Sequence, residues 1–380
     1  PESKLEEEII VRPTSETIIW SMYKKWIQSY RDLPILINQW ANVVRMEMRT
    51  RLFLRTTEFL WQEGHTAHAT ADEAEEETIN ILNLYIKLLE EVLAIPVYTG
   101  IKSDSEKFAG AVRTYCIEAM MGDKRALQAG TSHNLGQNFA KAFDVKFQSK
   151  DNKEQYVWAT SWGITTRLIG ALILTHGDQK GLRLPPKIAP IQIVFIPIFK
   201  NNNQKKAILN YISPLIKKLK KNNIRYYEDW TNNSPGYKFN KWELKGVPIR
   251  IDIGPNDIEK SSFVLSRRDT GEKKSVLKKE VFKEIKKLLK EIQDGLFLQA
   301  KNFRNKNTHD VSNYKDLKKI IQKGGFVRCG WDGSEETETK IKLETKATIR
   351  CILLKQDIAD LKCVYSGKPA LFKVLFAKAY

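Results

Sequence analysis

Arginine, carboxylate, aromatic and histidine side chains share one face of a predicted β-hairpin at residues 43–68. Two runs of strand-forming residues, 43–48 and 57–63, flank a short basic segment, which is typical of two antiparallel strands and a loop. Side chains alternate between the two faces of a strand. One face is therefore expected to carry Val43, Arg45, Glu47, Phe59, Trp61, Glu63 and His65. The other face is expected to lie on a core and to carry Val44, Met46, Met48 and Leu60.

The first of these faces combines charged and aromatic side chains. A solvated sheet face is normally plain polar, so this mixture favours a pocket for a flat, charged ligand. The alternative is an ordinary edge hairpin with scattered exposed aromatics. Composition and alternation leave both interpretations open.

Arg167 is the single charged residue of a predicted apolar helix at 165–174. A cation in the first turn opposes the helix dipole and is costly to desolvate in a buried helix. Arg167 therefore needs an anionic partner, either a structural carboxylate or a phosphate of a ligand.

Two further segments carry candidate residues. Thr14 and Glu16 follow Pro13 and precede a run with helical periodicity, so helix capping is their simplest role. The segment 128–136 reads QAGTSHNLG, and its glycines would let a ligand approach the backbone closely. If it is extended, Thr131 and His133 point to the same side. The alternative is a plain glycine-containing turn.

The length of 380 residues predicts two or three domains, because single cores rarely grow that large. No apolar run approaches the ~20 residues that span a bilayer, and the start does not resemble a signal peptide. We therefore expect a cytoplasmic protein with no membrane partner. The first residue is Pro1, so we expect a processed or truncated piece. Four scattered cysteines predict reduced thiols.

The net charge of +18 is unevenly distributed. Residues 1–188 carry 23 basic and 24 acidic side chains, whereas the rest of the chain carries 40 and 21. One explanation is a coding bias toward lysine and asparagine. The other is that the second half binds a polyanion, because phosphates attract such a surface at long range.

The order of predicted elements indicates an α/β and α+β multidomain protein. The proline-rich segment PPKIAP marks a linker near residue 188. After it, strands alternate with helices over about a hundred residues, which predicts a compact α/β domain. We expect domains at 1–188, 189–300 and 301–380, the last a small α+β domain.

Many segments resemble class II aminoacyl-tRNA synthetases, and more closely the prolyl-tRNA synthetases. These segments span the chain and include RPTSET, RTTEFLWQEGHTAH, KFAGA, GTSHNLGQNFAK, SWGITTRLIGALI, WELKGVPIR and CGWDG. The resemblance implies an antiparallel catalytic sheet flanked by helices, an anticodon-binding domain and a C-terminal zinc-binding-like domain. It also implies a ligase that activates L-proline with ATP and Mg²⁺ and transfers the prolyl group to tRNA(Pro).

The resemblance also implies roles for individual residues. Arg45 and Arg167 are expected to stabilise charge at the transferring phosphate. ATP is expected to contact Arg45, Glu47, Arg55, Phe59, Gln128, Thr131 and Arg167. Proline is expected to contact Thr14, Glu16, Arg45, Trp61, Glu63, His65, His133, Gly163 and Thr165. No protein nucleophile is needed, because direct attack requires positioning and charge stabilisation.

The family's zinc pattern is broken in this chain. Cys329 and Cys363 match two ligand positions, whereas Ser334 and Tyr365 stand where cysteines would be. A closed structural zinc site needs four nitrogen or sulfur ligands. We therefore expect no zinc, with both cysteines buried by packing.

Two other departures concern the architecture. Only about sixty residues separate His65 from Gln128. One branch of the family inserts a large editing domain in this interval, and so short a segment leaves no room for it. The chain therefore resembles the archaeal and eukaryotic type of the family. Motif 1, which builds the dimer interface, would lie before RPTSET and is not found. We expect an N-terminally incomplete catalytic domain, and a homodimer for the full-length protein.

Three competing functions are weighed against this one. A synthetase-like, non-catalytic tRNA-binding or regulatory protein would be expected to lose its ATP-binding arginines, and Arg45, Arg55 and Arg167 are present. A threonine enzyme would need a core zinc, but Cys116 is the single cysteine of the predicted core. A class II synthetase for serine or glycine is the third competing function. No feature points to DNA.

Overall fold

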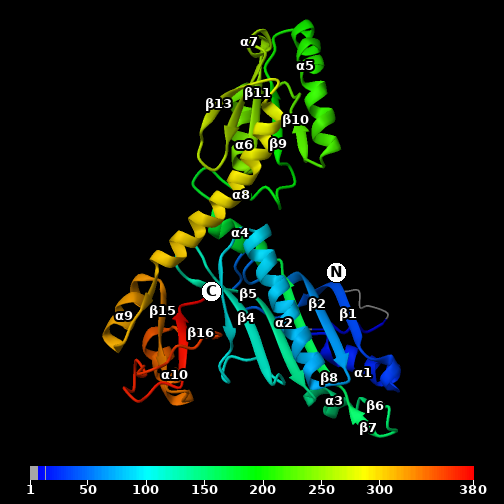
Figure 1. The fold of residues 1–380 in the computed structure, drawn as a ribbon, viewed down its shortest axis with the longest axis vertical. Helices are drawn as coiled ribbons and strands as arrows, with labels where there is room; N and C mark the ends of the chain where they lie inside the picture. Colours follow the sequence, from blue (N-terminus) through cyan, green and yellow to red (C-terminus); the bar gives the residue numbers. More distant parts are fainter. Residues whose placement is uncertain (1–6, 13) are drawn as a thin grey trace. The chain divides into compact units, whose positions relative to one another are not determined.

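The computed structural model describes residues 7–12 and 14–380. Pro13, ahead of the predicted helix, and residues 1–6 lie outside the described residues. The chain divides into two compact units (Figure 1). Unit 1 contains Pro1–Lys87, Val97–Ala171 and Lys306–Tyr380, and unit 2 contains Leu88–Pro96 and Leu172–Asn305.

Unit 1 is built on one large sheet, which has ten strands among the described residues. Six of these strands pair antiparallel in the order β1-β2-β8-β5-β4-β3. They are β1 Ile35–Val44, β2 Glu58–His68, β8 Trp158–Thr165, β5 Ala126–Gly136, β4 Arg113–Met120 and β3 Val97–Ile101. This arrangement agrees with the antiparallel sheet that the sequence predicted.

Helix α1, Glu16–Trp26, begins where the sequence predicted a helix start. Its apolar side buries Trp20 and Tyr23 against a core that includes Phe147. The Tyr23 hydroxyl donates a hydrogen bond of 2.8 Å to the carbonyl of His65 on β2. The helix therefore holds the strand that carries several candidate residues.

Helix α2, Ala71–Lys87, lies across β5 and β8 and buries Leu82 and Tyr85 (Figure 1). Ser132 on β5 donates a hydrogen bond of 2.8 Å to the carbonyl of Thr78 in this helix. The remaining short elements of this part of the chain are η1 Tyr30–Asp32, α3 Asn138–Phe143, β6 Lys146–Gln148, β7 Glu154–Tyr156 and α4 Arg167–His176.

The C-terminal segment continues the same sheet. Its strands follow β3 in the order β16-β17-β15-β14, and β16 pairs antiparallel with β3. A side chain at Gly100 of β3 would place its Cβ 2.2 Å from the Ile352 carbonyl, so only glycine allows this approach. The elements are β14 Thr308–Asp310, α9 Tyr314–Lys323, β15 Phe326–Trp331, α10 Glu335–Thr345, β16 Thr348–Leu353 and β17 Phe372–Ala377. The domain division at residue 300 stays a prediction.

Cys329 and Cys363 are buried in this segment, as the sequence predicted. Burial raises the pKa of the Cys329 thiol. Nearby, the Asp332 carboxylate accepts hydrogen bonds from the hydroxyls of Ser334 (2.9 Å) and Ser366 (2.6 Å). Among the described residues, no group of three or more His, Cys, Asp or Glu side chains could hold a metal ion.

Unit 2 contains a five-stranded sheet in the order β10-β9-β11-β12-β13. Its core packs Phe195 and Ile251 of the sheet against Ile212 and Ile285 of two helices. The elements are η2 Leu88–Val92, β9 Ile193–Pro197, α5 Asn202–Lys221, β10 Tyr226–Glu228, α6 Pro235–Leu244, β11 Ile249–Ile253, α7 Pro255–Glu259, β12 Ser262–Arg267, β13 Lys273–Leu277 and α8 Val281–Lys306. Of the helices in the described ranges, none has both the length and the apolar character to cross a membrane.

His176 gives unit 2 an acid-sensitive core. It is 1% exposed, and its Nε2 lies 2.9 Å from the Leu93 carbonyl. Burial lowers the His176 pKa to about 4. The His176 imidazole therefore binds a proton more tightly in the unfolded state than in the folded state. The folded state keeps its full stability above about pH 6.5, where the imidazole is neutral in both states, and loses stability as pH falls toward 4.

We expect the free energy of unfolding to fall by about 3 kcal/mol between these pH values through this residue. Urea unfolding of the His176→Gln protein at several pH values should show a correspondingly smaller decrease. His309→Gln, which changes an exposed histidine, is the matched control. Equal acid sensitivity of the wild type and His176→Gln would contradict the prediction.

The predicted hairpin exists, but one of its faces was assigned wrongly. The first strand spans 35–44 rather than 43–48, because the β1–β2 ladder ends at the pair Val44 and Glu58. Met46 lies beyond the strand and is 97% exposed, and Met48 is exposed as well. Leu60 is 62% exposed and lies opposite Asn42, on the face that also exposes Leu36 and Trp40. Alternation sorted the side chains of β2, but it does not apply to residues 45–48, which lie outside the strand, and it could not show which face is covered.

Candidate active site

All fifteen residues that the resemblance selected line one cavity of about 530 Å³ in unit 1. They are Thr14, Glu16, Arg45, Glu47, Arg55, Phe59, Trp61, Glu63, His65, Gln128, Thr131, His133, Gly163, Thr165 and Arg167. Strands β2, β5 and β8 supply most of them as neighbours in the sheet. Val43, which the sequence placed on the same face, is buried and does not line the cavity.

One end of the cavity is basic and aromatic. The Arg45 guanidinium lies 5.4 Å from the ring centroids of both Phe59 and Trp61. These two rings meet edge to face, with centroids 5.8 Å apart. Arg55 lies 3.8 Å from the Glu47 carboxylate. A flat aromatic ligand with an anionic group fits such a surface, because the rings can stack and the cations can pair.

Arg167 enters the same end from the first residue of α4. Its Nε donates to the Leu54 carbonyl (3.1 Å) and its Nη1 to the Gln128 carbonyl (3.4 Å). Burial, followed by repulsion from Arg55, lowers the pKa of Arg167. Its hydrogen bonds go to carbonyl oxygens, and the nearby Glu118 carboxylate also favours its charge but does not outweigh burial and Arg55. The combined charge of three cavity arginines therefore favours an anionic ligand.

The other end of the cavity contains buried acid and imidazole groups. Glu63 and His65 are 3% and 2% exposed, and their Oε1 and Nε2 atoms lie 3.6 Å apart. Burial acts to raise the Glu63 pKa, but interactions with His65 and Ser15 outweigh it and lower the pKa below its usual value. Gln39 also donates a hydrogen bond to this carboxylate. Glu63 is therefore an anion at neutral pH.

His133 faces this acidic end as a neutral imidazole. Its Nδ1 lies 2.9 Å from the Thr114 hydroxyl, and the Phe108 ring lies 4.8 Å from its ring centroid. Burial, and then the nearby His65, lower the pKa of His133 to about 3. The residue can therefore hydrogen-bond a ligand without adding charge.

Polar atoms of Trp61 and His65, which flank Glu63 on the same face of β2, lack hydrogen-bond partners among the described residues. Within the described part of the chain, Trp61 Nε1 and both ring nitrogens of His65 are buried without one. Buried polar groups are normally paired, and leaving them unpaired is costly. A small polar ligand at this end would restore their hydrogen bonds.

Comparison with known proteins finds family models that match three segments of the chain. Residues 2–176 match the tRNA synthetase class II core domain (G, H, P, S and T). Residues 192–288 match the anticodon binding domain, and residues 314–380 match the C-terminal domain of prolyl-tRNA synthetase.

Curated relatives extend this match over the whole chain. The proline–tRNA ligase of Flavobacterium psychrophilum is 56% identical over 100% of this chain and 78% of its own length. That of Bacteroides fragilis is 55% identical with the same coverage. The Pelodictyon phaeoclathratiforme ligase is 58% identical over 99% of this chain and 80% of its own length. The chain belongs to the prolyl-tRNA synthetase family.

Membership of the prolyl-tRNA synthetase family confirms the predicted resemblance and fold class. Between His65 and Gln128 the structure has α2, η2, β3 and β4 and no inserted domain. Assignment to the archaeal and eukaryotic type stays a prediction. The expected lack of motif 1 and the roles of individual site residues also stay predictions.

Sequence reasoning missed part of the cavity wall. Lys102 and Phe108 lie in a loop after β3, and Thr114 lies on β4. Phe108 belongs to the KFAGA segment, whose resemblance to prolyl-tRNA synthetases was the available signal. The other missed lining residues are Phe53, Leu54, Thr56, Glu106, Ala129, Gly130, Ser161, Trp162 and Ile164.

Proposed function

We propose that this protein joins L-proline to tRNA(Pro) in two steps within the cavity of unit 1. The proline carboxylate first attacks the α-phosphorus of ATP, forming prolyl-adenylate as the bond to pyrophosphate breaks. A hydroxyl of the terminal tRNA ribose then attacks the prolyl carbonyl, and AMP leaves. The observation that carries this proposal is 55–58% identity to proline–tRNA ligases along the chain.

The arginine-rich end of the cavity suits the nucleotide. Phe59 provides a ring on which adenine can stack, and Glu47 can accept a hydrogen bond from it. Arg45, Arg55 and Arg167 would bind the phosphates and stabilise the charge that develops during attack on the α-phosphorus. ATP enters as its Mg²⁺ complex, in which the phosphates supply much of the coordination.

The acidic end suits proline. The amino group of proline is a cation, and the ionised Glu63 beside His65 offers it a charge-assisted hydrogen bond. Trp61, His65 and His133 enclose the same space and bring ring nitrogens close to the substrate. Gly163 faces Glu63 across the β2–β8 ladder, which leaves room for the ring.

Glu63→Gln tests the proline end separately. Removing the charge should raise the KM for proline about tenfold to a hundredfold, the usual size of one hydrogen bond to a charged group. The KM for ATP should stay within about twofold, since the proposed contacts to ATP do not include this carboxylate. Steady-state exchange kinetics measure both constants. A rise in both by the same factor would argue against a proline-specific role.

The overall proposal is tested by amino-acid-dependent pyrophosphate–ATP exchange. The full-length protein should exchange label with proline and not with threonine, serine or glycine. Stimulation by another amino acid in place of proline would refute the specificity. A lack of exchange with every amino acid would favour a non-catalytic tRNA-binding role.

We further propose three domains at 1–188, 189–300 and 301–380. The second would bind the tRNA anticodon, which agrees with its family model and with the basic charge of the second half. The protein would work in the cytoplasm with its tRNA, and the C-terminal segment would need no zinc, since Ser334 and Tyr365 are poor substitutes for thiolates.

Dimerisation of the full-length protein is also part of the proposal. Strands β1 and β2 lie at the edge of the sheet and expose Leu36, Trp40 and Leu60 on one face. An apolar group of this kind is typical of a contact between subunits. A second copy of the chain would cover it.

A further inference from the structure

Residues 102–108 form a loop that joins the cavity wall to the C-terminal segment. Lys102, Glu106 and Phe108 line the cavity. The Ser103 carbonyl accepts hydrogen bonds from the amides of Glu106 (3.0 Å) and Lys107 (2.9 Å), so Ser103 anchors the turn. The shape of this part of the cavity therefore depends on what holds Ser103 in place.

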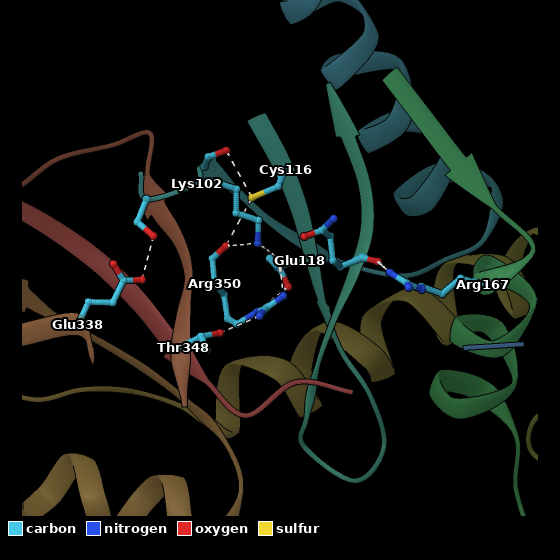
Figure 2. Close-up of polar contacts among 10 residues, drawn as sticks. Lys102, Cys116, Glu118, Arg167, Glu338, Thr348 and Arg350 are labelled. Carbon is cyan, nitrogen blue, oxygen red and sulfur yellow. Dashed lines mark hydrogen bonds and ion pairs between the residues drawn. The ribbon is translucent and has the colours of Figure 1, made fainter. Parts of the chain in front are cut away.

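The C-terminal segment supplies that support. The Ser103 hydroxyl donates a hydrogen bond of 2.9 Å to Glu338 of α10, and both side chains are buried. Next to it, Lys342 of the same helix pairs with Glu106 at 3.1 Å. Figure 2 shows Glu338 pointing from the C-terminal segment toward this loop. Both contacts reach across 235 or more residues of sequence.

A buried ionic cluster fixes the start of the same loop. The Glu118 carboxylate on β4 is 0% exposed and accepts two hydrogen bonds from Arg350 of β16, at 3.1 and 3.0 Å (Figure 2). Lys102 donates to the same carboxylate and to the Arg350 carbonyl, both at 2.8 Å. A buried ion pair contributes little net stability over apolar packing but fixes geometry well. The cluster holds Lys102 at the cavity.

The end of the loop, at Phe108, contacts the residues around His133 at the proposed proline end. The Phe108 amide donates to the Thr114 hydroxyl at 3.1 Å, and that hydroxyl contacts His133 Nδ1. The Phe108 ring also packs on the His133 ring. Displacement of the turn at Ser103 would therefore move the groups around His133.

We propose that the C-terminal segment is a positioning element for proline, with Glu338 holding Ser103 so that Phe108 and His133 keep their places. Glu338 does not line the cavity, so its role is to position and not to catalyse. This inference rests on the proposed function. It predicts that the affinity for proline, and not that for ATP, depends on a side chain outside the catalytic core.

The test compares exchange kinetics of Glu338→Ala with those of the wild type. The KM for proline should rise about fivefold to tenfold, the size of one hydrogen bond to a charged or buried acceptor. The turnover number and the KM for ATP should stay within about twofold. Glu338→Gln keeps an acceptor oxygen for Ser103 and should restore most of the affinity. Glu335→Ala, an exposed change on the same helix, is the matched control.

A double-substitution cycle separates positioning from a general loss of stability. Ser103→Ala and the double variant Ser103→Ala/Glu338→Ala should each show about the same proline KM as Glu338→Ala, because each of the three lacks the Ser103–Glu338 hydrogen bond. Additive effects, an unchanged proline KM, or equal rises for proline and ATP would overturn the inference. A wild-type protein without proline-dependent exchange would instead refute the proposed function.

Discussion

Replacing Arg45 with alanine is expected to reduce proline-dependent pyrophosphate–ATP exchange by about 10²- to 10³-fold, the usual cost of removing one group that stabilises transition-state charge. Arg45 lies above the Phe59 and Trp61 rings, which we propose to flank the nucleotide and the proline. At that place its guanidinium can contact both the α-phosphate and the attacking carboxylate. Filter binding should show that affinity for tRNA is largely unchanged, since we propose that residues 189–300 bind the anticodon.

The matched control for Arg45 is Arg49→Ala. Arg49 is exposed beyond the end of β1 and does not line the cavity, so its removal should change exchange by less than about twofold. Arg45→Lys should recover part of the activity, because lysine keeps the charge but loses the planar fork. Unchanged exchange in Arg45→Ala would show that the transferring phosphate lies elsewhere.

Arg167→Met is expected to reduce exchange by about 10²-fold and to raise the KM for ATP. Its guanidinium joins Arg45 and Arg55 at the cavity, and methionine fills a similar volume without the charge. Stability should respond differently from activity. Burial and repulsion from Arg55 lower the Arg167 pKa, so the folded protein gains by losing this charge, although two carbonyls lose a donor.

We therefore expect the melting temperature of Arg167→Met to stay near that of the wild type while exchange is lost. Such a combination is typical of a residue kept for function at some cost in stability. Thermal unfolding and exchange measured on the same preparation provide the comparison. A variant that melts much earlier but retains full specific activity would contradict the role in ATP binding.

The candidate site was largely predictable from the sequence because local patterns place it. Alternation along β2 puts Phe59, Trp61, Glu63 and His65 on one face whichever partner the strand has. The lone charge of an apolar helix pointed to Arg167, and the glycines of QAGTSHNLG pointed to the segment around His133; resemblance to the family then supplied their expected roles. The structure brings these separate segments to one cavity because β2, β8 and β5 are neighbours in the sheet.

Other features depend on contacts that no local pattern contains. Leu60 was expected in a core because it is apolar, but whether a sheet face is covered depends on distant elements. The pairing of β3 with β16 joins residues about 250 positions apart, so the continuation of the sheet into the C-terminal segment could not be read from periodicity. The same pairing brings Arg350 to Glu118 and explains why this cluster was missed.

Transfer of proline to tRNA tests the central claim most directly. The full-length protein should attach labelled proline to a tRNA(Pro) transcript in the presence of ATP and Mg²⁺, giving an acid-precipitable product and AMP. Periodate-oxidised tRNA, which lacks the terminal ribose diol, should accept no label. Charging of another amino acid in place of proline, or no charging by a folded protein that binds the tRNA, would contradict the account.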